Sequence, residues 1–406
     1  MLFIDDNSLM NKRQLLYLLI LFLYTSCGSK ITADLQSLIQ EVNNSSDTPS
    51  DNIDDSDNDD TDKIKIFAGL IEDSSRHFLG IEVDPLKSIA YLSVGNGDDC
   101  LCVIDYSTES QPTLSHCLGK TTIPSTIQSN CRSAKLVDNN EKILLPMYEK
   151  RVEVWSFGTT PKTISNWTRQ NAQTFSTKKP KRLSTYYNTG SLYEYVLSTH
   201  GGLLKTTYNS TDDSFSIINN GTDAFDNSSS KIYQDGAYLE DGFILATTAG
   251  TNKNVEIYNS SSSLIKTITL NNTSNYMWSS HVSEDNKTIA IGGNYLALIS
   301  YDATEINESD KFTLRHEQTL SKNMRHMKMF SLNSVDYLMG SFSDGTIRVF
   351  NITNIDSPTL IRNYDIEAFD GEAYDLYVDT TKERVLVAGT KGKFAILNLI
   401  ELIKTN

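Results

Sequence analysis

Tyr337-Leu-Met-Gly-Ser-Phe-Ser-Asp-Gly-Thr-Ile-Arg-Val-Phe350 holds two short apolar segments on either side of a Ser-Asp-Gly turn. Tyr337–Met339 and Ile347–Phe350 are each too short for a typical helix and are bounded by turn residues, which is the pattern of buried strands. The stretch therefore predicts two adjacent antiparallel strands, and the same arrangement recurs along the chain.

Seven units repeat this arrangement at a nearly constant period. The first strands of the units begin at Ile89, Ile143, Tyr193, Phe243, Ile289, Tyr337 and Val385, which are 54, 50, 50, 46, 48 and 48 residues apart. Six units continue with a second strand, at Cys102–Asp105, Val152–Trp155, Val255–Tyr258, Leu296–Ile299, Ile347–Phe350 and Phe394–Leu397, while unit three, around Leu203, matches least well. A period of 40 to 50 residues is typical of β-propellers, whose blades bury their faces only against one another.

The two ends of the repeat region predict how the ring closes. The last unit stops soon after its third strand, Phe394–Leu399, and a spare strand, Lys63–Phe67, precedes the first unit. An N-terminal strand that completes the last blade would remove two exposed sheet edges. We therefore predict an all-β fold: a seven-bladed β-propeller of four-stranded antiparallel blades over residues 63–406, closed by an N-terminal strand.

Short motifs resemble two propeller repeat families. Ser343–Asn351 resembles the hairpin of WD repeats, whereas Leu101–Asp105 and Ile352–Pro358 resemble the bacterial LVIVD repeat. The resemblance implies a propeller that presents surfaces for binding. It implies no particular reaction, because propellers carry many unrelated functions.

The N-terminus has the layout of an export signal. Lys12 and Arg13 precede the apolar run Leu15–Leu23, which is too short to span a bilayer, and residues 1–26 are interpreted as a signal peptide. Tyr24-Thr-Ser-Cys27 resembles a bacterial lipobox, although Tyr24 stands where that family prefers Leu. We predict lipidation at Cys27, with an ordinary cleaved signal peptide or a plain membrane anchor as the alternatives.

Charge is concentrated between this signal and the repeats. Residues 31–62 carry ten acidic and no basic residues, and residues 27–62 are interpreted as a disordered acidic tether. Residues 63–406 hold 33 basic and 39 acidic residues, a formal charge of only −6. This balance gives no basic footprint for nucleic acid, so we expect no nucleic-acid partner.

Four cysteines besides Cys27 suit an oxidising compartment. They are Cys100, Cys102, Cys117 and Cys131. Cys102 and Cys117 flank a predicted hairpin turn at matching distances, which makes Cys102–Cys117 the favoured disulfide among three pairings. Free thiols are the alternative, and the spacing does not suit a zinc site.

The sequence nominates no catalytic, metal or cofactor residues. Its six histidines are scattered, and no nucleophile elbow, phosphate loop or zinc-protease motif is present. Lys178–Arg182 is interpreted as an exposed inter-blade loop. The glycosylation sequons, among them Asn166, Asn209, Asn286 and Asn351, matter only if the protein is a secreted eukaryotic glycoprotein.

One recurring position predicts a ligand site. Counting back from each first strand reaches the mouth of the central channel, where the count finds Arg76, Arg132, Arg182, Arg325, Trp278 and Tyr374, with Gln234 in blade four. Converging arginines would form a positive funnel for carboxylate or phosphate. The alternative is that each arginine pairs with a neighbouring carboxylate.

These observations favour a non-enzymatic binding scaffold. We expect an exported monomer, anchored through Cys27 in the periplasm or at the cell surface, or otherwise secreted, that binds a protein or envelope component. The alternative is a propeller enzyme such as a lactonase-like hydrolase. Two converging carboxylates or a bound metal at the channel mouth would favour the enzyme, and a mouth that is flat, aromatic and lacking buried carboxylates would favour the scaffold.

Overall fold

The computed structural model describes residues 67–95, 98–119, 130–175, 178–218, 224–226, 232–239, 241–249, 254–270, 277–366 and 369–404. All of them belong to one compact unit, residues 58–406. The predicted signal peptide (1–26), Cys27, the tether (27–62) and residues 63–66 lie outside the described residues. Within the described ranges, no helix has the length and apolar character needed to cross a membrane.

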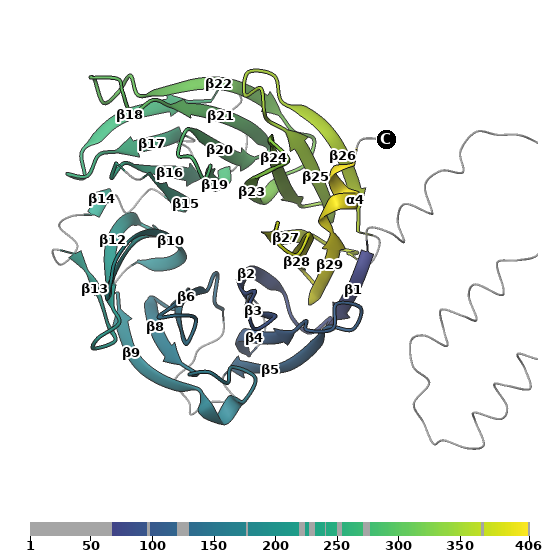
Figure 1. Ribbon diagram of the computed structural model, residues 1–406. Coiled ribbons are helices and arrows are strands. Elements are labelled where there is room, and N and C mark those ends of the chain that lie inside the picture. The colour runs from purple at the N-terminus through teal and green to yellow at the C-terminus, as the bar shows by residue number, and fades with distance from the viewer. Residues whose placement is uncertain are drawn as a thin grey trace, which may run out of the picture. The chain divides into compact units, whose positions relative to one another are not determined.

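The described strands form seven antiparallel blades around a common centre, and each blade runs from an inner to an outer strand (Figure 1). Five blades are separate four-stranded sheets, whereas blades three and four share one nine-stranded sheet through the pair His200–Ile232. Blade one holds β2 (Phe78–Asp84), β3 (Ile89–Val94), β4 (Asp99–Asp105) and β5 (Thr113–Gly119); blade two holds β6 (Lys135–Val137), β7 (Lys142–Met147), β8 (Arg151–Ser156) and β9 (Thr168–Thr174), with the short helix η1 (Ile164–Asn166) between its last strands.

The remaining blades follow the same order along the chain. Blade three holds β10 (Lys179–Thr189), β11 (Leu192–His200), β12 (Gly202–Asn209), β13 (Ser214–Ile217) and β14 (Ala224–Asp226); blade four holds β15 (Ile232–Tyr238), β16 (Ile244–Ala249), β17 (Asn254–Tyr258) and β18 (Leu264–Thr269). Blade five holds β19 (Met277–Val282), β20 (Thr288–Gly293), β21 (Tyr295–Tyr301) and β22 (Phe312–Thr319). Blade six holds β23 (Met324–Leu332), β24 (Val335–Phe342), β25 (Thr346–Asn351) and β26 (Thr359–Asp365). Blade seven holds β27 (Ala373–Asp379), β28 (Arg384–Gly389) and β29 (Lys393–Asn398), followed by α4 (Leu399–Ile403).

Burial of apolar side chains between blades explains why the repeats close into a ring. The described core divides into seven hydrophobic clusters, one at each interface between neighbouring blades. The cluster between blades seven and one joins Phe394 to Phe78, both fully buried, so the last repeat packs against the first. Burying a large apolar side chain contributes roughly 1.5–3 kcal/mol, and no blade can do so alone on both faces. The predicted all-β, seven-bladed fold is confirmed.

The N-terminal strand closes the ring. β1 (Phe67–Glu72) forms the outer strand of blade seven, where it pairs antiparallel with β29, as Figure 1 shows in purple beside yellow. Of the predicted strand Lys63–Phe67 only Phe67 lies among the described residues, and it belongs to β1, whose pairing with β29 is described from Phe67 to Glu72. Leu70 of β1 packs against the cluster between blades six and seven.

Six inner strands share an irregularity that determines the mouth of the channel. Near its start, each has one extra residue against its neighbouring strand, which is the definition of a β-bulge, and β10 has a second shift between Thr185 and Tyr187. The extra residues are Leu79, Lys181, Gln234, Trp278, Arg325 and Tyr374. A bulge residue leaves the regular alternation of the strand, so its side chain takes a direction of its own.

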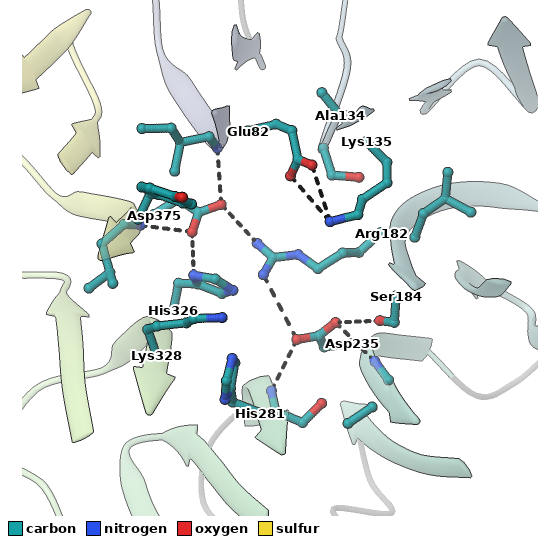
Figure 2. A pocket seen from close by; sticks show the side chains of 18 of the residues that line it. Glu82, Ala134, Lys135, Arg182, Ser184, Asp235, His281, His326, Lys328 and Asp375 are labelled. Atoms are coloured by element: carbon teal, nitrogen blue, oxygen red, sulfur yellow. Dashed lines mark hydrogen bonds and ion pairs between the residues drawn. The ribbon is translucent and has the colours of Figure 1, made fainter. Parts of the chain in front are cut away.

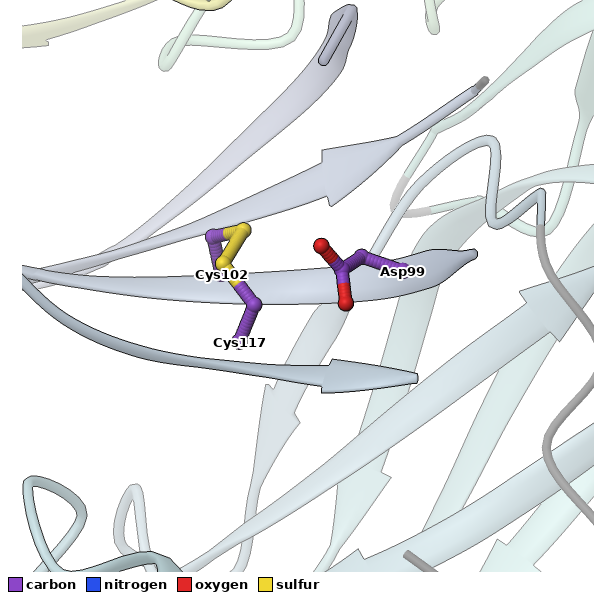
Figure 3. Close-up of side chains that lie close together, drawn as sticks. All are labelled: Asp99, Cys102 and Cys117. Atoms are coloured by element: carbon purple, nitrogen blue, oxygen red, sulfur yellow. A yellow bond between two sulfur atoms is a disulfide. The ribbon is translucent and has the colours of Figure 1, made fainter. Parts of the chain in front are cut away.

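Two disulfides cross-link blade one and tie it to the start of blade two. Cys102 and Cys117 face each other on β4 and β5 and are bonded, which is the pairing that the hairpin spacing favoured (Figure 3). Cys100 is bonded to Cys131. Asp99 lies within 4.8 Å of the Cys102 and Cys117 sulfur atoms. Because these sulfurs are bonded to each other, neither is the thiolate that a metal ion would require.

We expect loss of β1 to destabilise the ring. A chain truncated to begin at Asp73 loses the outer strand of blade seven and exposes β29, so its unfolding midpoint is expected to fall by at least about 5 °C, since roughly 1 kcal/mol shifts the midpoint of a large domain by about 2 °C. A chain lacking only residues 31–60 serves as the control and is expected to melt like the full chain. Equal thermal midpoints for the two deletions, measured by circular dichroism, would contradict the closing role of β1.

Candidate functional site

Two connected cavities follow the axis of the ring. The deeper one, of about 430 Å³, is lined by the inner strands of all seven blades and is called the channel here. The second, of about 230 Å³, lies where the inner strands begin and is called the mouth cavity. Arg182 lines both. The mouth cavity is lined by Arg132, Tyr148, Lys181, Arg182, His200, Gln234, Trp278, Arg325 and Tyr374.

The structure brings together five of the six residues predicted at the mouth. Arg132, Arg182, Arg325, Trp278 and Tyr374 all line the mouth cavity. The bulges explain this convergence, because Trp278, Arg325 and Tyr374 are the extra residues of β19, β23 and β27. One repeated backbone irregularity therefore points side chains from different blades at the same space.

Arg76 does not line the mouth cavity, so its predicted place in the funnel is wrong. Its guanidinium pairs with Asp73 and its Nε donates to Asp99 Oδ2 at 2.6 Å. The bulge residue of blade one is Leu79, three residues after Arg76 and almost fully buried. Counting residues back from the second strand of blade one therefore found Arg76, whereas the bulge that corresponds to the mouth positions of the other blades is at Leu79.

Arg182 is engaged in a network of ion pairs in the channel (Figure 2). Its Nη1 lies 3.8 Å from Asp235 Oδ2 and its Nη2 lies 3.6 Å from Asp375 Oδ2. Asp375 also pairs with His326 Nδ1, and His326 and Arg182 together hold the pKa of the Asp375 carboxyl below its usual value against the opposing effect of burial. Burial opposes the charge of Arg182, but Asp235 and Asp375 raise its pKa above the ordinary value. The charge of Arg182 is thus balanced inside the channel.

Arg325 is balanced as well. Its Nη2 lies 2.7 Å from Glu372 Oε1, and its guanidinium lies 4.3 Å from the centre of the Trp278 ring and 5.7 Å from that of Tyr374. A guanidinium over aromatic faces is stabilised by the ring quadrupole. The side of the mouth formed by blades five, six and seven is therefore a packed aromatic wall around a paired arginine.

The opposite side of the mouth carries positive charge without such balance. Arg132, Lys179 and Lys181 are called the basic cluster from here on. The Arg132 guanidinium lies 5.3 Å and Lys179 Nζ 4.6 Å from the centre of the Tyr148 ring. Lys181 Nζ donates to the Gln234 side-chain oxygen. Within the described part of the chain, no carboxylate lies within 4.0 Å of any of these three cations.

The pKa values of neighbouring groups reflect this excess of positive charge. Burial, reinforced by Arg132 and Arg182, lowers the pKa of Lys181 to about 7. Burial, with added repulsion from Lys181, Lys179 and Arg132, lowers the pKa of His200 to about 4, so its imidazole is neutral at pH 7. Burial disfavours a charge of either sign at this site, whereas the repulsion between the neighbouring cations would be relieved by an anion.

Sequence reasoning missed most of the basic cluster. Lys178–Arg182 was interpreted as an exposed loop, but Lys179–Thr189 is the inner strand β10, and Lys181 is its bulge residue. The signal was available, since Lys181 lies in the same counting window as Arg182. Nothing in the sequence marked Tyr148 or His200, which reach the mouth from blade two and from the end of β11.

The mouth has the features expected of a binding site. Its lining includes the aromatic residues Tyr148, Trp278 and Tyr374 and, among the described residues, no carboxylate. Asp235 and Asp375 converge in the deeper channel, but both are held by Arg182 and by backbone N–H groups, including those of Ser280 and Ile81. These carboxylates are therefore explained by the packing of the ring.

Comparison with known proteins establishes the fold alone. No protein-family model and no curated protein matches the chain. The chain is similar to the Cps50 (Swd1) β-propeller domain of Myceliophteria thermophila, with 10% identity, 82% of this chain and 98% of that one covered, and a TM-score of 0.60. It is also similar to Sqt1 of Saccharomyces cerevisiae, with 12% identity, 82% of this chain and 99% of that one covered, and a TM-score of 0.55. A chain of a mitotic checkpoint complex is similar as well, with 12% identity, 92% of this chain and 99% of that one covered, and a TM-score of 0.58. These similarities show that the chain has the β-propeller fold.

The depressed pKa of Lys181 predicts a pH-dependent change in stability. Lysine in the unfolded chain has a pKa near 10.4, so between about pH 7 and 10 the unfolded state binds more protons and stability rises with pH. Lys181→Met removes this dependence. At pH 6 we expect the Lys181→Met variant to unfold a few degrees above the wild type. This difference in unfolding temperature should become smaller towards pH 9. Lys287→Met, which removes an exposed lysine, is the control, and a pH-independent difference for Lys181→Met would contradict the prediction.

Proposed function

We propose that the protein is a membrane-tethered, extracytoplasmic binding scaffold that holds an anionic group of a protein or envelope component in its mouth cavity. The observation that carries this proposal is the basic cluster: Arg132 and Lys181 line the cavity, Lys179 lies over the ring of Tyr148, which lines it too, and none of the three has a carboxylate partner among the described residues. Uncompensated charge at a partly buried position costs stability, so its presence is best explained by a ligand that supplies the missing anion.

The disulfides support a location outside the cytoplasm. Cys100–Cys131 and Cys102–Cys117 use all four cysteines of residues 63–406. Disulfides persist in oxidising compartments and are rare in reducing ones. Together with the basic and apolar N-terminal pattern before Cys27, they favour an exported chain.

The shape of the site favours capture over catalysis. The mouth cavity combines aromatic side chains, amide and guanidinium groups from several blades, as binding sites commonly do. Arg182 and Arg325 are fixed by ion pairs, so they form rigid walls of the cavity. The geometry accommodates one small anionic group and offers it charge-assisted hydrogen bonds.

The tether is tested at Cys27. We expect Cys27→Ser to move the protein from the membrane fraction to the soluble fraction, because the proposed acyl chains would be its main source of bilayer affinity. Fractionation followed by immunoblotting measures the distribution, with mass spectrometry of the N-terminal peptide as the companion readout. Unchanged membrane retention of the variant would overturn the lipid anchor.

The mouth is tested by charge reversal. Arg132→Glu places a negative charge in the basic cluster, and we expect the yield of cross-linked partner from solubilised membranes to fall about tenfold, the equivalent of roughly 1.4 kcal/mol. Lys287→Glu makes the same charge change at an exposed lysine on the turn between β19 and β20 and should have no effect. Partners captured equally by both variants at matched folding would rule out the mouth cavity as the binding site.

A further inference from the structure

We propose that the basic cluster is a subsite for a doubly charged oxyanion, the phosphate group of a phosphate monoester. This inference rests on the proposed function and specifies the chemistry of the anion that the mouth cavity takes. It follows from three features of the cluster: its charge, the arrangement of its donors and the response of Lys181 to a bound anion.

The first feature is the amount of uncompensated charge. Each of the other two arginines in the mouth already has its carboxylate: Arg325 has Glu372, and Arg182 lies between Asp235 and Asp375. Arg132 and Lys179 have none among the described residues, and Lys181 adds a third, partly protonated cation. One carboxylate would neutralise only a single charge. A phosphate monoester carries between −1.5 and −2 at pH 7, which matches the cluster more closely.

The second feature is the direction of the donors. The Arg132 guanidinium and the Lys179 ammonium, from blades two and three, both lie close to the ring of Tyr148, which lines the mouth cavity together with Arg132. Arg132 Nε is buried and has no hydrogen-bond partner in the described structure. Lys181 is oriented from the bulge of β10 towards blade four by Gln234. A planar fork together with ammonium groups suits a tetrahedral oxyanion, which offers three free oxygens.

The third feature links binding to protonation. The groups facing Lys181 are Arg132 from blade two, His200 from β11, Arg182 of its own strand and Gln234 from blade four. Burial, Arg132 and Arg182 keep its pKa at about 7, and a bound dianion would oppose these effects and raise it. The complex should therefore take up a proton at Lys181, and affinity should increase as pH falls towards 6.5.

Calorimetric titration of the purified full-length protein tests the subsite. Sulfate is the first probe because it stays doubly charged between pH 6.5 and 8.5. Any change of its affinity with pH therefore comes from titrating groups of the protein. We expect sulfate to bind about tenfold more tightly at pH 6.5 than at pH 8.5, with proton uptake revealed by buffers of different ionisation enthalpy. Lys181→Met should abolish both effects and Lys179→Met should weaken binding about tenfold, whereas Lys287→Met should behave as the wild type.

The chemical class is decided by further probes at pH 7. O-phosphoserine and glucose 6-phosphate should each bind at least about tenfold more tightly than acetate, and the tighter of the two indicates whether the phosphate comes from a peptide or a sugar. A hexaglutamate peptide that binds as well as phosphoserine, or acetate that binds as well as sulfate, would overturn the phosphate assignment. Thermal melts with and without sulfate give a second readout for any variant that folds poorly.

The two proposals can fail separately. If none of the oxyanions binds but Arg132→Glu still abolishes partner capture, the phosphate subsite is wrong and the binding scaffold stands. If the oxyanions bind as expected but Arg132→Glu leaves partner capture unchanged, the scaffold function assigned to the mouth is wrong and the subsite stands.

Discussion

The seven inner strands are sheet edges that face the axis of the ring, and their free backbone N–H groups must find partners there. Side chains from neighbouring blades supply several of them. Asp375 accepts from Ile81 N at 3.2 Å and Asp235 accepts from Ser280 N at 3.0 Å. Leu136 N donates to Glu82, and Met329 N donates to His281 Nδ1. An unpaired buried N–H group is costly, so the fold itself requires acceptors in the channel.

Two of those acceptors are buried carboxylates, and Arg182 supplies a positive charge that pairs with them. Asp235 and Asp375, from blades four and seven, lie in the channel with exposed side-chain fractions of 4% and 7%, and the guanidinium of Arg182 between them pairs with both. Buried charges are tolerated when they are paired and hydrogen-bonded, and removing one partner of such a set is strongly destabilising. Charged residues in the channel are therefore poor evidence of catalysis here. Charged residues that pair with no carboxylate and satisfy no backbone group of the ring are better evidence of function, and among the described residues the three of the basic cluster are of this kind.

The sequence predicted the ring well because burial enforces regularity. Every apolar run that set the period lies in the second strand of its blade, from Ile89 in β3 to Val385 in β28, since that strand is covered on both faces. The mouth was predicted less well. Arg76 and Lys181 show why: a bulge shifts the alternation by one residue, and apolar periodicity does not reveal where a bulge lies. Tyr148 and His200 reach the mouth through contacts between blades, which single-sequence reasoning cannot supply.

The irregular blade also carries two of the three residues of the basic cluster. Unit three matched the repeat least. Among the described residues, its interface with blade four has the smallest hydrophobic cluster, which includes Tyr233 and Tyr258, whose hydroxyls bond to the buried Glu256. β10 brings Lys179, Lys181 and Arg182 to the axis within four residues. Only Arg182 satisfies a need of the ring. A repeat fold obtains its stability from features that all blades share. Cations that occur in one blade and have no carboxylate partner therefore do not help to close the ring. Lys179 and Lys181 of blade three are thus residues that the closure of the ring does not explain.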